Sequence, residues 1–208
     1  MRISRFLMLA VLAGASTSVI AQAVPAGPDL GPTVSSRSPI AVSLSYTAMI
    51  SNSPPGSCGC FLLNGGSGEG VFHVWRNVAA VVQVGGNHTN QVPNSIQGLS
   101  LMTFMGGPRY SFLPMHRVTV YGQFLAGDVH GFYSYFPGSG GSSTGGADSL
   151  AIAPGGGVEI GLRGWISLKA VEGEYLMTRL PNSQDTSQHN LRISSGVVFR
   201  FSTIRLIR

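Results

Sequence analysis

Alternation of apolar and polar residues is the feature of this sequence that most constrains its fold. In the segment LRISSGVVFRF, at 191–201, one parity carries the apolar residues Leu191, Ile193, Val197, Phe199 and Phe201. The other parity carries Arg192, Ser194, Gly196 and Arg200. Successive side chains of a β-strand point to opposite faces, so this pattern predicts a strand with one apolar face and one polar face. A second long alternation, from Ile40 to Ile50, predicts another such strand.

Eight segments of this kind follow one another along the chain. They lie at 40–50, 69–74, 78–86, 99–112, 117–128, 149–162, 166–180 and 191–201. Long polar connections (51–68, 87–97, 132–147 and 181–189) alternate with short turns (75–77, 113–116 and 163–165). Tight turns at one end and long loops at the other are typical of small outer-membrane barrels. The pattern predicts an all-β fold, an eight-stranded antiparallel up-and-down transmembrane β-barrel.

Three local irregularities are expected within these strands. In the seventh, Ile166 and Leu168 share one parity while Val171 has the other, which predicts a bulge near Lys169 or Ala170. Proline has no backbone N–H to give to a neighbouring strand. We therefore expect Pro108 and Pro154 to lie at local irregularities.

The ends of the chain are expected to lie outside the barrel. A basic start, an apolar run from Phe6 to Ile20 and the small residues before position 24 predict a signal peptide at 1–23, cleaved after Ala23. The apolar run is too short to favour the alternative, an N-terminal membrane anchor. Residues 24–39, rich in proline, are expected to be an unstructured leader, and 202–208 a tail after the barrel at 40–201.

Composition decides which face of the sheet is expected to face outward. Charged residues make up 10% of the chain, against roughly 25% in a typical soluble domain. A soluble lipocalin-like barrel, the alternative, would need many charges on its polar face. That face instead carries mostly Ser, Thr, Gly, Ala and Gln. Because an eight-stranded barrel has just enough interior for side chains to fill it, small residues and a few charges suit the inside, and the apolar face should meet lipid.

The few charges on the polar parity are the candidate functional residues. They have opposite signs, and they comprise Arg109, Glu159, Glu172, Glu174, Arg192 and Arg200. Buried charges must be paired to be tolerated, so these six are expected to form a charge network in the lumen. Glu172 and Glu174 could also be interpreted as a paired-carboxylate site, but balancing the three arginines is the favoured interpretation.

Seven segments together resemble the OmpA-like, opacity-type outer-membrane β-barrel family. They are CGCFLLNGGSGEG, VVQVGGNHT, GPRYSF, VYGQFLAGDVHG, APGGGVEIGL, EYLMTRLPN and LRISSGVVFRF, and they cover nearly all of 40–201. The resemblance implies an eight-stranded barrel in the outer membrane. Gly196, Phe199 and Phe201 are similar to the C-terminal signal read by the barrel-assembly machinery. The tail at 202–208 departs from the family, whose barrels usually end on the final aromatic residue.

The two cysteines, Cys58 and Cys60, are separated by one glycine. After export they would meet an oxidising compartment, where a small, strained and labile disulfide is one interpretation. The other is a loop tip whose cysteines stabilise local structure. The five histidines show no metal-ligand spacing, and a C-x-C pair alone supplies too few ligands. No metal or other cofactor is therefore expected.

The sequence predicts a non-enzymatic membrane protein that displays surface loops, with a role in envelope integrity, adhesion or surface binding. Its expected partners are outer-membrane lipid and, during biogenesis, the assembly machinery; it is expected to be a monomer. An enzyme site at the barrel rim, built from Asp128, His130 and Ser134, is an alternative. Nucleic acid is not an expected partner, because the formal charge is only +5 and no dense Lys/Arg run occurs.

Overall fold

The computed structural model describes residues 38–52, 60–92, 98–114, 117–137, 143–181 and 187–201. Eight strands account for nearly all of them: β1 (Ile40–Asn52), β2 (Cys60–Trp75), β3 (Val78–Thr89), β4 (Leu99–Pro114), β5 (Val118–Pro137), β6 (Ser143–Arg163), β7 (Ile166–Thr178) and β8 (Gln188–Phe201). Within this part of the chain no helix has the length and apolar character needed to cross a membrane. The predicted signal peptide with Ala23, the leader up to residue 37 and the tail at 202–208 lie outside the described residues.

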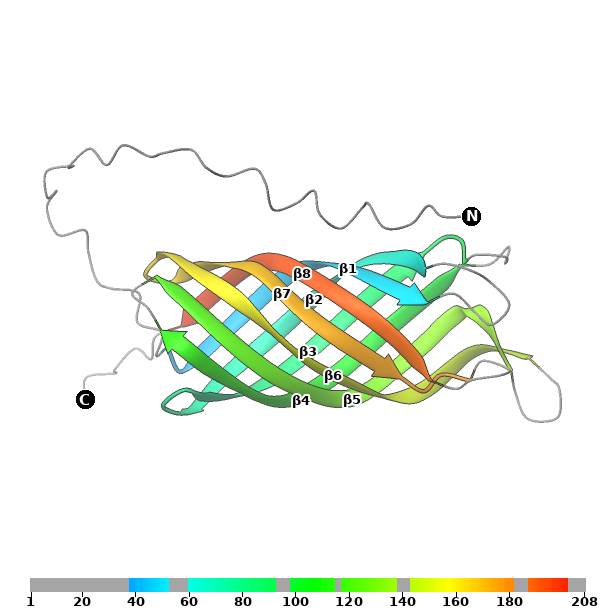
Figure 1. Ribbon diagram of the computed structural model, residues 1–208, viewed down its shortest axis with the longest axis horizontal. Helices are drawn as coiled ribbons and strands as arrows, with labels where there is room; N and C mark the ends of the chain where they lie inside the picture. The colour runs from blue at the N-terminus through cyan, green and yellow to red at the C-terminus, as the bar shows by residue number, and fades with distance from the viewer. Residues whose placement is uncertain are drawn as a thin grey trace, which may run out of the picture. The chain divides into compact units, whose positions relative to one another are not determined.

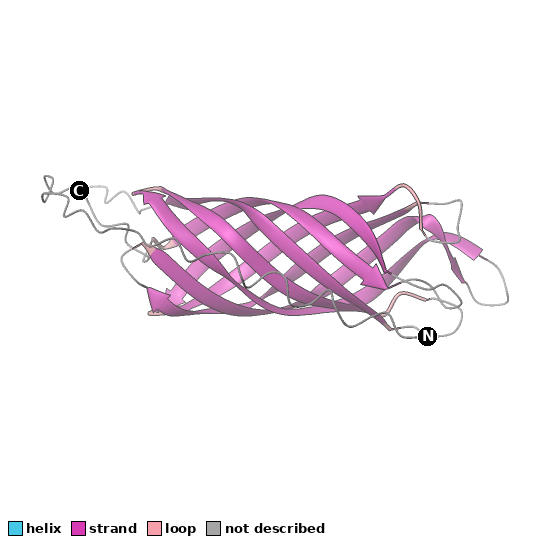
Figure 2. Cartoon of the chain, turned by 45° about the horizontal axis from the view of Figure 1, so that its top comes forward, coloured by secondary structure: helices cyan, strands magenta, loops and turns pink. Residues whose placement is uncertain are grey.

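The strands form a closed barrel in which each pairs with its neighbour in the chain and β1 pairs with β8 (Figure 1). All pairs are antiparallel. If the residue paired with Ser43 is found in β2, its partner in β3, and so on through every strand, the path ends at Gln188 in β8. Ser43 itself pairs directly with Val198 of β8, ten residues further along that strand. This stagger of ten residues tilts the strands by about 40° from the barrel axis, given ~3.3 Å per residue and ~4.8 Å between strands. Figure 2 shows the tilt.

The apolar parity faces outward, as the sequence predicts. In β1 the side chains of Leu44 and Tyr46 are 62% and 60% exposed, while Ser43, Ser45 and Thr47 between them are buried. In β8 Leu191, Ile193 and Phe201 are exposed, whereas Arg192, Ser194 and Arg200 are buried. The barrel is therefore apolar outside and polar in much of its interior, the opposite of a lipocalin-like barrel.

Several strands are longer than predicted. The second half of the segment 51–68, predicted as a loop, belongs to β2, which begins at Cys60. Likewise β5 runs to Pro137 and β6 begins at Ser143, inside the predicted loop at 132–147. The prediction was wrong there because it treated glycine as a loop signal. In this barrel glycine allows close backbone approach: a Cβ on Gly65 would lie 1.8 Å from the carbonyl oxygen of Gly86.

The expected irregularities are confirmed. Glu159 pairs with Lys169 and Val158 with Val171, which leaves Ala170 as the extra residue of a bulge. The bulge explains the change of parity in β7. Pairing between β4 and β5 passes from Gly106 directly to Arg109, so it skips Pro108 without a register shift. Pairing between β6 and β7 likewise passes from Ile152 to Gly155 and skips Pro154.

Gly155→Ala should destabilise the barrel. The new Cβ would lie 2.6 Å from the carbonyl oxygen of Gly173 and 2.7 Å from Cγ of Glu174, inside the lumen. Overpacking of this kind costs about 1–3 kcal/mol, to be measured by urea unfolding in lipid vesicles. The matched control is Gly173→Ala on the outer face, where no atom lies within 4 Å of the new Cβ. It should be neutral or stabilise by up to about 1 kcal/mol; equal losses in both variants would contradict the steric argument.

Candidate functional site

Among the described residues, eight charged side chains lie inside the barrel. Four are basic and four acidic: Arg109, Lys169, Arg192 and Arg200, and Glu69, Glu159, Glu172 and Glu174. None is more than 7% exposed. They come from β2, β4, β6, β7 and β8, so the network ties together strands that are not neighbours. The four positive and four negative charges balance, as buried charges require.

Arg109 is the centre of this network. Its Nη2 donates to Oε1 of Glu69 at 2.6 Å, and its Nη1 lies 3.5 Å from Oε1 of Glu159. The guanidinium carbon also lies 3.9 Å from the ring centroid of Tyr121, a cation–π contact. Glu159 continues to Arg200, whose Nη2 donates to Oε2 of Glu159 at 2.5 Å. One arginine of β4 thus links the carboxylates of β2 and β6.

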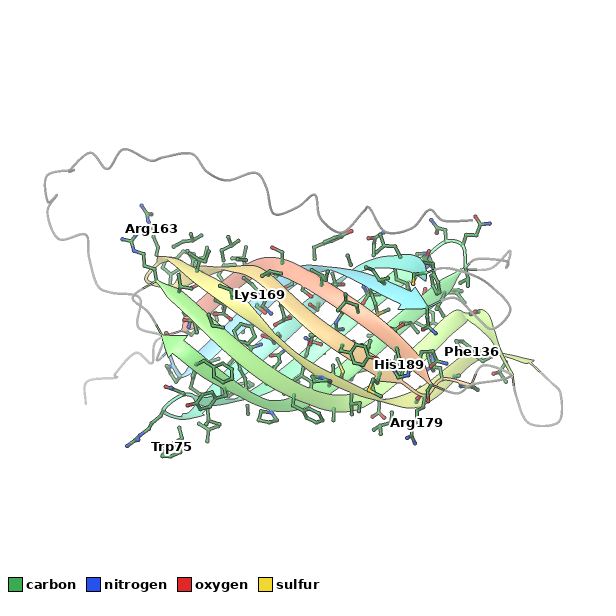
Figure 3. The ribbon with its side chains drawn as sticks, viewed as in Figure 1. Trp75, Phe136, Arg163, Lys169, Arg179 and His189 are labelled. Atoms are coloured by element: carbon green, nitrogen blue, oxygen red, sulfur yellow. The ribbon has the colours of Figure 1, made fainter. Side chains whose placement is uncertain are left out.

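Lys169 links the network to β7 (Figure 3). Its Nζ lies 3.3 Å from Oε1 of Glu69 and 3.1 Å from Oε2 of Glu172. The hydroxyl of Tyr121 donates to the same oxygen of Glu172 at 2.5 Å. The Ala170 bulge follows Lys169 directly, so both Lys169 and Glu172 point inward although they are three positions apart.

A further ion pair, between Arg192 and Glu174, is connected to the rest of the network through Gln123. Nε of Arg192 donates to Oε2 of Glu174 at 2.8 Å, and its Nη2 donates to the side-chain oxygen of Gln83. Gln123 bridges the two parts: its amide nitrogen donates to Glu174 at 3.2 Å, and its oxygen accepts from Nε of Arg109 at 2.9 Å. The contacts form one continuous network.

The structure brings together all six charged residues predicted for the lumen. It adds Glu69 and Lys169, which the prediction omitted. A usable signal existed for both: counting parity back from Val74 places Glu69 on the inward face, and the parity of Ile166 and Leu168 places Lys169 there. The bridging glutamines, Gln83 and Gln123, carry no charge and so were not selected.

Inward-facing glycines provide the space for this network. A Cβ on Gly85 would lie 2.8 Å from Oγ1 of Thr103 and 3.2 Å from Nη1 of Arg192. One on Gly157 would lie 2.7 Å from the hydroxyl of Tyr121. Arg192 of β8 therefore occupies room left by glycine on β3, and Tyr121 of β5 occupies room left by its pairing partner Gly157 on β6.

The interior nearer the long connections holds large buried apolar side chains beside buried polar ones such as Asn87 and Asn190. The apolar side chains at the strand ends next to these connections form a buried hydrophobic layer. It includes Met49, Leu63, Leu101, Val129, Phe136, Leu176 and Leu180. Together with the charged network, this layer fills the barrel from one end towards the other. The interior has the structure of a packed core.

Aromatic side chains gather on the outer surface at the turn end of the barrel, where β2–β3 and β6–β7 connect. Trp75, Tyr110, Phe112, Trp165 and Phe201 are each 46–64% exposed there. At the opposite end the outward side chains include the histidines His88, His130 and His189. Figure 3 shows Trp75 and Arg163 at one end, and Arg179 and His189 at the other.

The remaining predicted residues lie as follows. Phe201 pairs with Ile40 at the closing seam, and the ring of Phe199 stacks on Trp165 with 6.0 Å between centroids. A Cβ on Gly196 would lie 2.1 Å from the carbonyl oxygen of Leu44, so close strand packing requires glycine there. Cys60 is exposed at the start of β2, and Cys58 lies outside the described residues. The disulfide therefore stays a prediction.

The structure does not assemble the predicted rim triad. Nδ1 of His130 lies 2.6 Å from Oδ1 of Asp148, on the outer surface. Within the described residues, His130 has no hydrogen bond to Asp128 or Ser134. In the same part of the chain no group of three or more His, Cys, Asp or Glu side chains is placed to hold a metal ion.

Solved structures of other proteins align with this chain. Neisserial surface protein A aligns with a TM-score of 0.60 and 15% identity, over 79% of this chain and 98% of that one. Ail, the attachment invasion locus protein of Yersinia pestis, gives 0.47 and 16%, over 76% and 98%. The N-terminal β-barrel domain of Pseudomonas aeruginosa OprF gives 0.42 and 14%, over 77% and 97%.

No protein-family model matches the sequence, and no curated protein matches it. The likeness of structure nevertheless confirms, at the level of the fold, the resemblance to small outer-membrane barrels of the OmpA-like type.

Arg192→Met should destabilise the barrel strongly. The substitution removes the ion-pair partner of Glu174, both side chains being fully buried. Leaving a buried charge unpaired costs about 3–5 kcal/mol. The double variant Arg192→Met with Glu174→Leu should lose less than the single one. The measurement is urea unfolding in lipid vesicles.

Arg163→Met, at the exposed turn between β6 and β7, is the control for loss of an arginine. Its stability should change by at most about 0.5 kcal/mol. The network would have no structural role if Arg192→Met and Arg163→Met unfolded at the same urea concentration.

Proposed function

We propose that this chain is a non-enzymatic integral protein of the bacterial outer membrane, exported by a signal peptide and inserted by the barrel-assembly machinery. The barrel serves as a scaffold that displays four connecting segments, with a role in envelope integrity, adhesion or surface binding. We further propose that it acts as a monomer.

One observation carries the proposal: large apolar side chains are exposed around the barrel wall, while the eight charged side chains of the network lie inside. Between the aromatic residues at the turn end and the histidines at the loop end, the described outward positions hold apolar residues and glycine, with Asp128 and Ser195 among the exceptions. Exposed side chains of this kind occur on all eight strands, for example Leu44, Val74, Val82, Phe104 and Phe124. A continuous band of this kind is costly in water and favourable in lipid.

The packed interior favours a scaffold over a diffusion pore. Charged side chains and the apolar layer occupy it, and wide water-filled channels require barrels with many more strands. The connections at the loop end are longer than the turns at the other end. In outer-membrane barrels the longer connections are extracellular, which supports the proposed role in surface display.

Cell fractionation tests the proposal. The protein should be recovered in the outer-membrane fraction and should migrate faster on gels when unheated than when heated, because the closed barrel resists detergent. Its recovery as a soluble periplasmic protein would overturn the proposal.

Val82→Arg should destabilise the barrel in lipid. Val82 is 55% exposed near the middle of β3, and arginine on a lipid-facing position at the bilayer centre costs roughly 2–4 kcal/mol. The matched control is His88→Arg, on the same face of the same strand but near the loop end, where the expected cost is about 0–1 kcal/mol. Unfolding in lipid vesicles measures both. Equal losses would contradict a lipid-facing wall.

A further inference from the structure

The hairpin formed by β5 and β6 continues beyond the closed ring of strands. Pairing of β6 with β5 extends from Ile160 to Ser143, whereas pairing of β6 with β7 extends only to Ala151. The segment 143–150 therefore has β5 on one side, and no described strand pairs with it on the other side. Figures 1 and 2 show this hairpin projecting past the other strands at the loop end. An unpaired strand edge of this kind is a template for a further strand.

The chain that follows β7 turns towards β8 and does not continue along this edge. The N–H of Leu180 donates to Oε1 of Gln188 at 3.0 Å, and Nε2 of Gln188 donates to the carbonyl oxygen of Leu180 at 2.8 Å. The N–H of Arg179 donates to the hydroxyl of Ser149 at 2.8 Å, a bond to a side chain and not to the β6 backbone. Among the described residues, the β6 edge thus loses its neighbour at the end of β7.

Three residues of this segment direct their backbone groups towards the open edge. Successive residues of a strand point their N–H and C=O groups to opposite sides. Pro154 has no N–H, and the pairing with β7 skips it, so its nitrogen lies on the β7 side of the strand. Thr144, Gly146 and Asp148 have the parity of Pro154. Their N–H and C=O groups therefore point away from β5, to the side where β7 is missing.

The β6 edge has few of the features that protect exposed strands from pairing. Proline, lysine and bulges are the usual ones. The segment 143–150, STGGADSL, contains neither proline nor lysine. The bulge of the hairpin lies in β5, between Phe132 and Phe136. Asp148 is the one charged residue of the segment, and Nδ1 of His130 lies 2.6 Å from its Oδ1. The edge is therefore flat, and its charge already has a partner.

Packing against the barrel interior holds the hairpin in place. The side chain of Phe136 is buried in the hydrophobic layer, and a Cβ on Gly131 would lie 2.6 Å from its Cζ. Ala147 packs against the same layer. A free two-stranded hairpin is marginally stable in water, so this packing orders the edge before any partner binds. A preordered edge costs less conformational entropy on binding.

We propose that this edge binds an extended segment of another protein, which adds a strand to β6 through main-chain hydrogen bonds. The proposal rests on the proposed function, which places the loop end at the cell surface. The segments before β1 and after β8 leave the barrel at the turn end, the far end from this edge. They are therefore not the occupant.

A second copy of the chain in the same membrane does not fit the edge either. The strands are tilted by about 40° from the barrel axis, so two β6 strands related by a rotation about the membrane normal would cross at roughly 80°. Neighbouring strands of a sheet differ by only about 20–25°. A flexible segment of another protein can align with β6 without this constraint.

Peptide binding tests the proposal. The full barrel is reconstituted in phosphatidylcholine nanodiscs, and the probe is a fluorescein-labelled, net-neutral peptide with a core of alternating threonine and valine. Fluorescence anisotropy should show saturable binding, and hydrogen exchange measured by NMR should slow at the amides of Thr144, Gly146 and Asp148. A second peptide, with a core of alternating serine and isoleucine, should bind with an affinity within about threefold, because the contact is made by the main chain. Failure of both peptides to bind would overturn the proposal.

Methylated peptides provide the first control. Alternate amides of a bound strand face β6, and the others face away. Methylation of one alternate set of amide nitrogens should weaken binding about tenfold, and methylation of the other set should leave it unchanged. Equal effects of the two sets would show that binding does not depend on strand pairing.

Two neighbouring substitutions provide the matched protein variants. Gly146→Pro removes an N–H that points to the open edge, and it should weaken binding about tenfold. Gly145→Ala keeps every N–H, and its Cβ would meet no atom within 4 Å, so binding should not change. Equal affinity in the two variants would contradict the proposal. So would slow exchange at the same three amides without peptide that increases with protein concentration, because a second copy would then be the occupant.

Heat-dependent gel mobility of the same samples separates this proposal from the proposed function. A protein that inserts and shows the faster band but binds neither peptide would refute the binding edge alone. A protein that fails to insert would refute the membrane function itself.

Discussion

The pairing of the first strand with the last is the constraint on which the rest of this structure depends. It runs from Ile40 opposite Phe201 to Ser51 opposite Asn190 and leaves no open edge in the ring. A lipid bilayer offers no water to satisfy backbone N–H and C=O groups, so a sheet can remain there only when it is closed. Closure also creates an inside and an outside, and the alternation of the sequence then assigns every side chain to one of them.

The interior that closure creates is narrow, and its contents explain two unusual features of composition. Charges are few, and eight of them are inside the barrel, where they cancel in pairs around Arg109 and Glu174. Glycines are many, 29 in 208 residues, and part of that number allows close strand approach and leaves room for long side chains. Both features follow from packing a ring of eight strands without a void.

The sequence predicts the strand number, the antiparallel order, the sense of the two faces and the β7 bulge, because each depends on local alternation. The starts of β2 and β6 were not predictable in the same way. Their glycines, such as Gly65 and Gly146, are read locally as loop residues, and only the neighbouring strands show that they pair. For the interior, parity identifies which charges point inward. The partner of each depends on the stagger of the ring: Arg109 reaches Glu69 across 40 residues of sequence.

The two prolines that interrupt backbone pairing also weaken the contact between neighbouring strands at two places in the barrel wall. Pro108 lies in the ladder that joins β4 to β5, and Pro154 lies in the ladder that joins β6 to β7, whereas β5 and β6 pair with each other without a break from Val118 to Phe132. The β5–β6 hairpin is therefore a continuously paired unit, and it has a weaker strand pairing on each side, with β4 and with β7. When the barrel opens locally, backbone amides in the β4–β5 and β6–β7 pairings should exchange with solvent deuterium first. The β5–β6 hairpin between them should move as a unit.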